Sequence, residues 1–206
     1  MRVLYVGTDP SRYQHTGELV HYPVIRTVLR ASIDDVLRRD VARCTHWLFT
    51  SPNAVRHWFS IGAPGCFEKS FAVGPSTAAA LWQKGIQAKV APIATQEGLI
   101  ELLEVVDLEG ALIGWPRSSK ARTVLGDYLS RRSVSFLSIV LYEPVTQRLE
   151  PVPDLALFDE IVFTSPSTVE AFLEIFGRIP WEKKIVPIGP VTADRLESHA
   201  RPRRIL

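Results

Sequence analysis

Two stretches of this chain repeat each other, and they decide its fold. Residues 47–62 read WLFTSPNAVRHWFSIG, and residues 161–177 read IVFTSPSTVEAFLEIFG. A second pair follows in the same order, FAVGPSTAAAL at 71–81 and VPIGPVTADRL at 186–196. The first pair is offset by 114 residues and the second by 115. Because solenoid repeats have periods of only about 20–50 residues, the offset indicates a duplicated domain of about 115 residues.

Each copy alternates strand and helix signals. Trp47–Thr50 and Ile161–Thr164 are short apolar or β-branched runs, which are typical of buried strands. Ser51 and Ser165 suit the N-cap of a following helix, and the prolines after them suit its first position. The apolar residues that follow recur at helical spacing. The second motif repeats this scheme with a Gly-Pro turn.

The same alternation runs through the rest of the chain. Further strands are predicted at residues 2–7, 22–25, 71–73, 88–91, 111–115, 134–142, 185–188 and 203–206, and further helices at residues 32–43, 96–106 and 119–131. Such alternation favours parallel sheets with helices on both faces. We therefore predict an α/β fold with two similar flavodoxin-like doubly wound parallel-sheet domains. Ligands of such sheets bind beyond the carboxyl ends of the strands.

The composition excludes several classes of protein. The 206 residues are 46% hydrophobic and 22% charged with a net charge of +2, which is ordinary for a globular chain. This balance does not call for nucleic acid as a partner. No apolar run approaches the roughly 18 residues of a membrane helix. Two cysteines and no export signal at the N-terminus predict free thiols in the cytoplasm.

Standard catalytic motifs are missing from the sequence. There is no dinucleotide fingerprint, phosphate-binding loop, nucleophile elbow or HExxH zinc motif. The five histidines form no metal-like spacing, so no metal site is expected. His46 and His57 are interpreted as structural or exposed.

Four strand-to-helix turns are the candidate binding elements. Each brings hydroxyl groups and free backbone N–H groups to a helix N-terminus, which together favour an anion. The alternative is plain helix capping. A fifth turn at 115–122 adds cations, for which a solvated basic turn is the alternative. The candidates are Thr50, Ser51 and Asn53; Gly74, Pro75 and Thr77; Thr164, Ser165 and Ser167; Gly189, Pro190 and Thr192; and Arg117 and Arg122. We expect a cleft between two domains that holds a ligand with several carboxylates or phosphates.

An ordered set of motifs resembles one known family. The motifs are FTSPNAV at 49–55, AVGPSTAAAL at 72–81, TQEGL at 95–99, PRSSKAR at 116–122, LYEPV at 141–145, FTSPSTV at 163–169 and IGPVTA at 188–193. Each motif is weakly specific, but the ordered set covers nearly the whole chain. It resembles the uroporphyrinogen-III synthases.

The resemblance implies a domain layout and a reaction. Residues 1–30 would join 148–206 in one discontinuous α/β domain, residues 35–143 would form an inserted domain, and residues 22–26 and 141–146 would be two linker strands. The implied reaction cyclises hydroxymethylbilane with loss of water and inversion of ring D. No cofactor is implied, the partner is this small polycarboxylate, and a transient hand-over from the preceding enzyme of the pathway is possible. We expect a monomer.

The resemblance also implies roles for particular residues. Tyr142 matches a family tyrosine whose phenol could donate a proton or hydrogen bond to the departing hydroxyl, the alternative being an aromatic side chain that only packs the linker. The four turns, with Arg117 and Arg122, would bind substrate carboxylates. One departure is Asp9, which stands where the family commonly has a cation. Arg12 could supply the missing positive charge.

Two rival functions remain open on the sequence alone. One is a two-domain protein that binds an anionic ligand without chemistry. The other is an inactive homologue that keeps the fold. Two features favour it: Asp9 stands where the family commonly has a cation, and the second copy of the repeat is shorter than the first.

Overall fold

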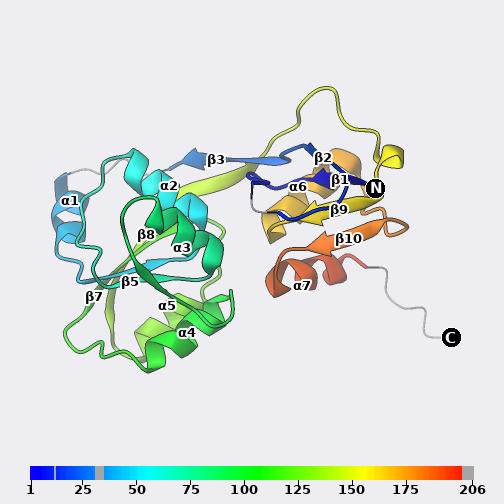
Figure 1. Cartoon of the computed structure of the whole chain (residues 1–206). Helices are drawn as coiled ribbons and strands as arrows, with labels where there is room; N and C mark the ends of the chain where they lie inside the picture. The colour runs from blue at the N-terminus through cyan, green and yellow to red at the C-terminus, as the bar shows by residue number, and fades with distance from the viewer. Residues whose placement is uncertain (12, 31–34, 201–206) are drawn as a thin grey trace. The chain divides into compact units, whose positions relative to one another are not determined.

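The chain forms two compact units. The structure is a computed structural model that describes residues 1–11, 13–30 and 35–200 (Figure 1). Unit 1 comprises Met1–Arg26 and Pro144–Leu206, and unit 2 comprises Thr27–Glu143. The chain passes from one unit to the other twice, within β3 (Ile25–Leu29) and within β8 (Ser135–Thr146).

Unit 2 holds a six-stranded sheet in the order β3-β8-β7-β4-β5-β6 (Figure 1). The five strands from β8 to β6 are parallel. Numbered 1 to 5 along the chain from β4 to β8, they have the doubly wound order 3-2-1-4-5 when the sheet is read from β6 to β8. Its elements after β3 are α1 (Asp35–Ala42), β4 (His46–Phe49), α2 (Pro52–Ser60), β5 (Ser70–Ala72), α3 (Pro75–Trp82), β6 (Ala88–Val90), α4 (Gln96–Glu104), β7 (Leu112–Ser118) and α5 (Val124–Arg131).

Alternate residues of the unit 2 strands supply two separate cores. Trp47 and Phe49 pack with α2 and α3 on one face, whereas Leu48 packs with α4 and α5 on the other. This follows from the two-residue period of a strand. The helices therefore cover both faces of this sheet, as the alternation of strands and helices predicts.

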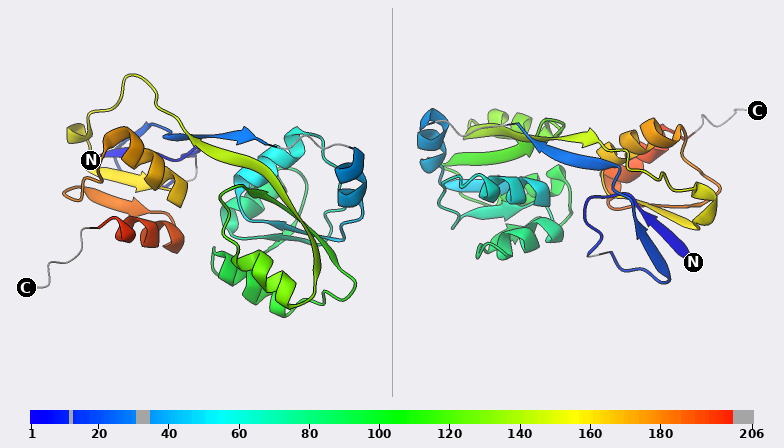
Figure 2. Two further views of the ribbon diagram at one scale, coloured as in Figure 1. Left: turned by 180° about the vertical axis from the view of Figure 1, so that it is seen from behind. Right: turned by 90° about the horizontal axis from the view of Figure 1, so that it is seen from above.

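Unit 1 holds a four-stranded parallel sheet in the order β10-β9-β1-β2 (Figure 2). Its elements are β1 (Arg2–Tyr5), β2 (Glu18–His21), a 3₁₀ turn (Leu155–Leu157), β9 (Glu160–Phe163), α6 (Pro166–Phe176), β10 (Lys184–Pro187) and α7 (Pro190–Ser198). The repeated motifs place β9 and β10 in the same roles as β4 and β5. Both copies thus start from the same strand–turn–helix unit.

The helices of unit 1 pack on one face only. Leu4 and Ile161 lie in the core with α6 and α7, whereas Val3, Tyr5 and Val162 face the other way and pack with Tyr13 and Leu19. The described residues between β1 and β2 form no helix. A short irregular segment therefore covers the second face of this sheet.

Buried Glu160 anchors that irregular segment. The Tyr13 hydroxyl donates to Glu160 Oε1 at 2.5 Å, and Lys184 Nζ lies 2.7 Å from Oε2. Burial by itself would raise the pKa of Glu160, but the hydrogen bonds from Lys184 and Tyr13 outweigh it and hold the pKa below its ordinary value. The carboxylate therefore stays charged inside the fold and ties the segment to β9.

Replacing Tyr13 with phenylalanine should destabilise unit 1 by about 1.5–3 kcal/mol, the range for a hydrogen bond to a charged group. Glu160 stabilises the fold above its unfolded pKa of about 4.3, and this contribution is lost as the pH falls through the lowered folded value. The variant raises that folded value, so acid unfolding should begin at a higher pH. Urea titration at neutral pH and acid titration by circular dichroism measure the two effects.

The matched control is Tyr128→Phe. Tyr128 is buried, whereas Tyr13 is half-buried, and the Tyr128 hydroxyl has no hydrogen-bond partner among the residues that the structure describes. Its loss should change the free energy of unfolding by less than about 0.5 kcal/mol. Equal stabilities of the two variants would contradict a role for the Tyr13–Glu160 bond.

The structure corrects two predicted elements. The strand predicted at 22–25 is absent, because β2 ends at His21, β3 begins at Ile25, and Pro23 between them has no N–H for a ladder. Residues 116–118, predicted as a turn after Trp115, belong to strand β7 instead, because β7 continues to Ser118 beside the longer β8. The helix predicted from residue 119 therefore begins only at Val124, as α5. Arg12, the start of the helix predicted from Ser32 and the strand predicted at 203–206 lie outside the described residues.

Candidate functional site

A hydrogen bond joins the first repeated turn to β8 in unit 2. Ser51 is the N-cap of α2, where its Oγ accepts from the backbone N–H of Ala54 at 3.0 Å and Pro52 takes the first helical position. The same Oγ lies 2.6 Å from the hydroxyl of Tyr142. The predicted cap is confirmed, and the predicted phenol lies directly against it.

Tyr142 is a neutral phenol in a buried place. Its side chain is 5% exposed, and burial raises its pKa above the ordinary value near 10 although the Ser51 hydrogen bond opposes the shift. When the Ser51 hydroxyl donates to the phenol oxygen, the phenol proton is left to donate elsewhere. The chain Ala54 N–H to Ser51 to Tyr142 is then a relay of hydrogen bonds that polarises this proton.

His57 is a neighbour of Tyr142 that the sequence did not point to. The two rings are stacked with centroids 5.1 Å apart and an interplanar angle of 28°. The imidazole Nε2 lies 2.8 Å from Thr27 Oγ1. Burial, assisted by the charge of Arg56, lowers its pKa below the ordinary 6.5, so the ring is neutral at physiological pH. No spacing in the sequence predicts this contact, because β8 lies far along the chain.

The other residues of the first turn are half-buried and already hydrogen-bonded. Trp115 Nε1 donates to Thr50 Oγ1 at 3.3 Å. Arg56 donates to Asn53 Oδ1 at 3.0 Å. The structure therefore brings Thr50, Ser51 and Asn53 to one edge of the sheet, at the carboxyl end of β4.

The second turn of unit 2 offers backbone rather than side-chain groups. Gly74 is the N-cap of α3 and makes no side-chain cap; a Cβ there would lie 2.9 Å from Cβ of Ala94. Pro75 is exposed. Thr77 is fully buried, and within the described part of the chain its hydroxyl has no partner. The Thr77 hydroxyl predicted to face a ligand does not reach solvent here.

Both predicted arginines of unit 2 have protein partners. Arg117 lies on β7, its Nε donates to Ser138 Oγ at 2.6 Å, and its guanidinium lies 5.3 Å from the ring centroid of Trp115. Arg122 donates to both carboxylate oxygens of Glu97, at 2.6 and 2.8 Å, and this lowers the pKa of Glu97 to about 2. Both guanidinium groups are therefore already hydrogen-bonded to protein side chains in this structure.

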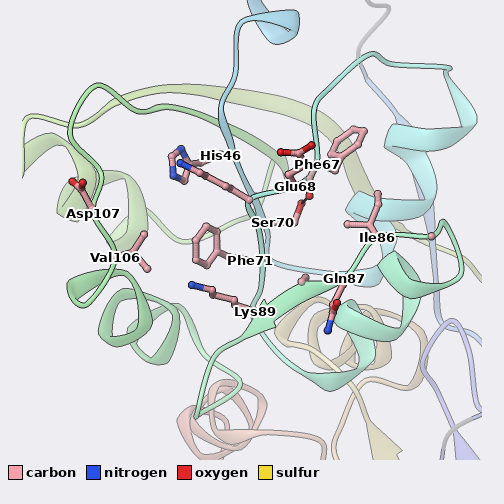
Figure 3. A pocket seen from close by; sticks show the side chains of 13 residues that line it. His46, Phe67, Glu68, Ser70, Phe71, Ile86, Gln87, Lys89, Val106 and Asp107 are labelled. Atoms are coloured by element: carbon pink, nitrogen blue, oxygen red, sulfur yellow. Dashed lines mark hydrogen bonds between the residues drawn. The ribbon is translucent and has the colours of Figure 1, made fainter.

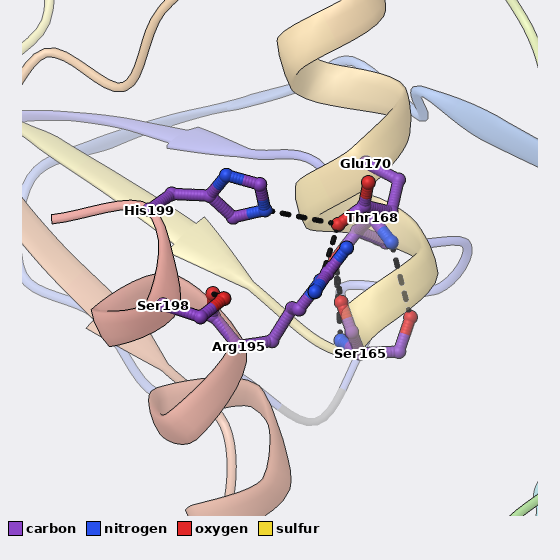
Figure 4. Close-up of polar contacts among 6 residues, drawn as sticks. All are labelled: Ser165, Thr168, Glu170, Arg195, Ser198 and His199. Carbon is purple, nitrogen blue, oxygen red and sulfur yellow. Dashed lines mark hydrogen bonds and ion pairs between the residues drawn. The ribbon is translucent and has the colours of Figure 1, made fainter.

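The corresponding turn of unit 1 repeats the cap (Figure 4). Ser165 and Thr168 form a capping box at the start of α6, in which Thr168 N–H donates to Ser165 Oγ at 3.3 Å. Thr164 and Ser167 are half-buried beside it. A Cβ at Gly7 would lie 2.4 Å from Cγ2 of Thr164, so only glycine lets the end of β1 approach this turn.

The last turn precedes α7. Gly189 has a φ of 92°, which favours glycine, and Pro190 after it is exposed. The buried Thr192 donates its hydroxyl to Ile188 O at 3.4 Å, so this hydroxyl also faces inward. Arg195 and His199 both contact Glu170 Oε1, at 2.5 and 3.2 Å, which ties α7 to α6 (Figure 4).

Two broader features of the described residues complete the picture. No three of their His, Cys, Asp or Glu side chains gather as a metal site would need. No helix among them is both long enough and apolar enough to span a membrane.

These observations define the class of the protein. It is an α/β protein with two parallel-sheet units, each of which has capped helix starts at the carboxyl end of its sheet, where proteins of this class bind ligands. Comparison with known families is more specific. Residues 11–205 match the family described as "Uroporphyrinogen-III synthase HemD", and the chain belongs to this family.

Individual relatives agree with this family. A provisionally assigned uroporphyrinogen-III synthase from Methanothermobacter thermautotrophicus is 29% identical over 94% of this chain and 88% of its own length. The crystal structure of uroporphyrinogen-III synthetase from Helicobacter pylori has a TM-score of 0.66 at 20% identity, over 98% of this chain and 91% of its own. A mutant synthase from Thermus thermophilus has a TM-score of 0.60 at 21% identity, over 96% and 88%. At identities of 20% and 21%, these two structures support the fold alone.

Proposed function

We propose that this chain is a uroporphyrinogen-III synthase, which cyclises hydroxymethylbilane to uroporphyrinogen III in tetrapyrrole biosynthesis. Family membership over residues 11–205 supports the reaction. The observation that carries the chemistry is the 2.6 Å contact between Tyr142 and Ser51. This contact supports the assignment of a neutral hydroxyl donor at the carboxyl end of a parallel sheet.

The reaction needs one proton donor and much positioning. The terminal hydroxyl of the linear substrate leaves as water with help from the pyrrole nitrogen, and the proton that completes this water comes from a group beside it. We assign this donation to Tyr142, whose raised pKa keeps the phenol protonated. In their 2.6 Å contact we assign the donor role to the Ser51 hydroxyl, which then orients the phenol. His57 packs against the ring and limits its rotation.

Positioning is assigned to the helix starts. The substrate is a flexible polycarboxylate, and without guidance it would close to the other isomer. Holding such a chain in one geometry can be worth roughly 7–11 kcal/mol in favourable cases. Backbone N–H groups at the starts of α2, α3, α6 and α7 suit carboxylates. Thr77 and Thr192 would act through these backbones, because their hydroxyls are buried.

We propose a monomer in the cytoplasm that receives its substrate by transient hand-over from the preceding enzyme. Arg117 and Arg122 remain candidates for substrate carboxylates, which would have to compete with Ser138 and with Glu97.

The decisive experiment is the isomer ratio of the product. Purified protein supplied with hydroxymethylbilane should give mainly the type III isomer, whereas the bilane alone closes to type I. Chromatography of the oxidised porphyrins separates the two. A ratio equal to that without protein would reject the synthase, and tight binding of the bilane without turnover would identify an inactive binding homologue instead.

A further inference from the structure

The phenol of Tyr142 is contacted at two points, and both contacts come from helix α2. Ser51, the N-cap of this helix, lies 2.6 Å from the hydroxyl. His57, further along the same helix, is stacked on the ring with centroids 5.1 Å apart. Because one helix carries both groups, the ring and the hydroxyl of Tyr142 have a fixed direction relative to α2.

His57 is itself anchored on a strand. Its Nε2 lies 2.8 Å from Oγ1 of Thr27, and both side chains are half-buried. Thr27 belongs to β3, which is the neighbour of β8, the strand of Tyr142, in the sheet. A ring nitrogen forms its hydrogen bond in the plane of the imidazole. The imidazole therefore cannot turn away from the phenol without losing the Thr27 contact.

Direction decides whether a phenol can serve as a proton donor. A donor must lie within about 2.6–3.2 Å of the atom that it protonates, and a misplacement of about 1 Å can cost about 10²-fold in rate. A tyrosine side chain has several staggered rotamers, and a change of rotamer would carry the Tyr142 hydroxyl away from Ser51. Packing against its ring therefore bears directly on the rate of donation.

We propose that His57, anchored by Thr27, is a positioning residue that holds the phenol of Tyr142 in the direction in which it donates to the departing hydroxyl. This inference rests on the proposed function, because it gives His57 and Thr27 a part in the same dehydration. Both side chains act through the phenol rather than on the substrate. No proton is transferred to or from the imidazole.

A second threonine–histidine pair in the same unit supplies the matched control. His46 is stacked on Phe71 with centroids 6.3 Å apart, and its Nδ1 lies 2.8 Å from Thr45 Oγ1. It lines a pocket at the amino ends of β4, β5 and β6 (Figure 3), whereas Tyr142 contacts the turn at the carboxyl end of β4. His46→Ala therefore removes a stacked imidazole from unit 2 but leaves the contacts of Tyr142 in place.

Steady-state kinetics with hydroxymethylbilane test the proposal. His57→Ala should lower kcat for the type III isomer about tenfold and change KM by less than about twofold. Thr27→Val keeps the shape of the side chain without its hydroxyl and should lower kcat about threefold, whereas Thr27→Ser should restore it. His46→Ala should keep kcat within about twofold of the parent. In the Tyr142→Phe background, His57→Ala should have almost no further effect, because it acts through the missing hydroxyl.

Nuclear magnetic resonance of protein labelled at its tyrosines tests the same contacts without substrate. The ring signals of Tyr142, assigned by their absence from Tyr142→Phe, should shift in His57→Ala because the stacked imidazole no longer shields them. They should shift in the same direction in Thr27→Val and return in Thr27→Ser. His46→Ala should leave them in place.

Three results would overturn the proposal. They are a kcat of His57→Ala equal to that of His46→Ala, a loss in His57→Ala that adds in full to that of Tyr142→Phe, and Tyr142 ring signals that stay in place in Thr27→Val. A parent protein that forms no type III isomer would reject the proposed function instead. The ring signals would then still decide whether Thr27 and His57 hold the phenol.

Discussion

Tyr142→Phe should lower kcat/KM for formation of the type III isomer by about 10²-fold, the lower end of the range for loss of a general acid. The variant keeps the ring and its stacking on His57 but removes the hydroxyl that contacts Ser51. The slower dehydration should show mainly in kcat, because the helix starts that would hold the substrate carboxylates are unchanged. Stopped assays with chromatography of both isomers measure the rate and the product ratio together.

Tyr128→Phe is again the matched control. Tyr128 is a buried tyrosine of the same unit whose hydroxyl has no partner among the described residues. Its rate should equal that of the parent. Ser51→Ala should fall between the two variants, since it leaves the phenol but removes the group that orients it. A Tyr142→Phe rate equal to that of Tyr128→Phe would exclude a chemical role for the phenol.

Trp58→Ala should cost about 3–5 kcal/mol of the free energy of unfolding, the usual range for removal of a large buried aromatic side chain. Trp58 is fully buried on α2 and lies with its ring centroid 5.0 Å from that of Trp47. The cavity would open beneath the helix whose N-terminus Ser51 caps. Urea unfolding followed by far-ultraviolet circular dichroism measures the loss.

Trp82→Ala is the matched control for this change. Trp82 ends the neighbouring helix α3 and is 68% exposed, so its removal should change stability by less than about 0.5 kcal/mol. If the two units unfold in separate steps, only the step of unit 2 should move. Similar losses in the two variants would contradict the burial seen here.

Much of the fold could be predicted because its signals are local. A serine that caps a helix and a proline at the first position act within four residues, so the starts of α2 and α6 could be inferred from Ser51 and Ser165 alone. The strands before them are short apolar runs bounded by these caps. The repeat then extended the inference to both copies.

Other elements depended on pairing that the sequence does not display. β7 runs through Pro116 and Arg117 because β8 continues to pair beside it. On its other side β7 pairs with β4 only at Ile113 and Gly114, so no backbone hydrogen bond from Pro116 is needed there. The irregular cover of unit 1 likewise depends on Tyr13 reaching Glu160, which is 147 residues away.

The sequence by itself determined the α/β class, the duplication and the candidate turns, since caps, prolines and strand periodicity act over a few residues. Only the tertiary structure decided which of these groups meet. It brought Tyr142 to Ser51 across 91 residues, placed His57 on the phenol, and turned the hydroxyls of Thr77 and Thr192 inward. The reason is that burial and strand order depend on contacts between distant segments, and no local pattern encodes those contacts.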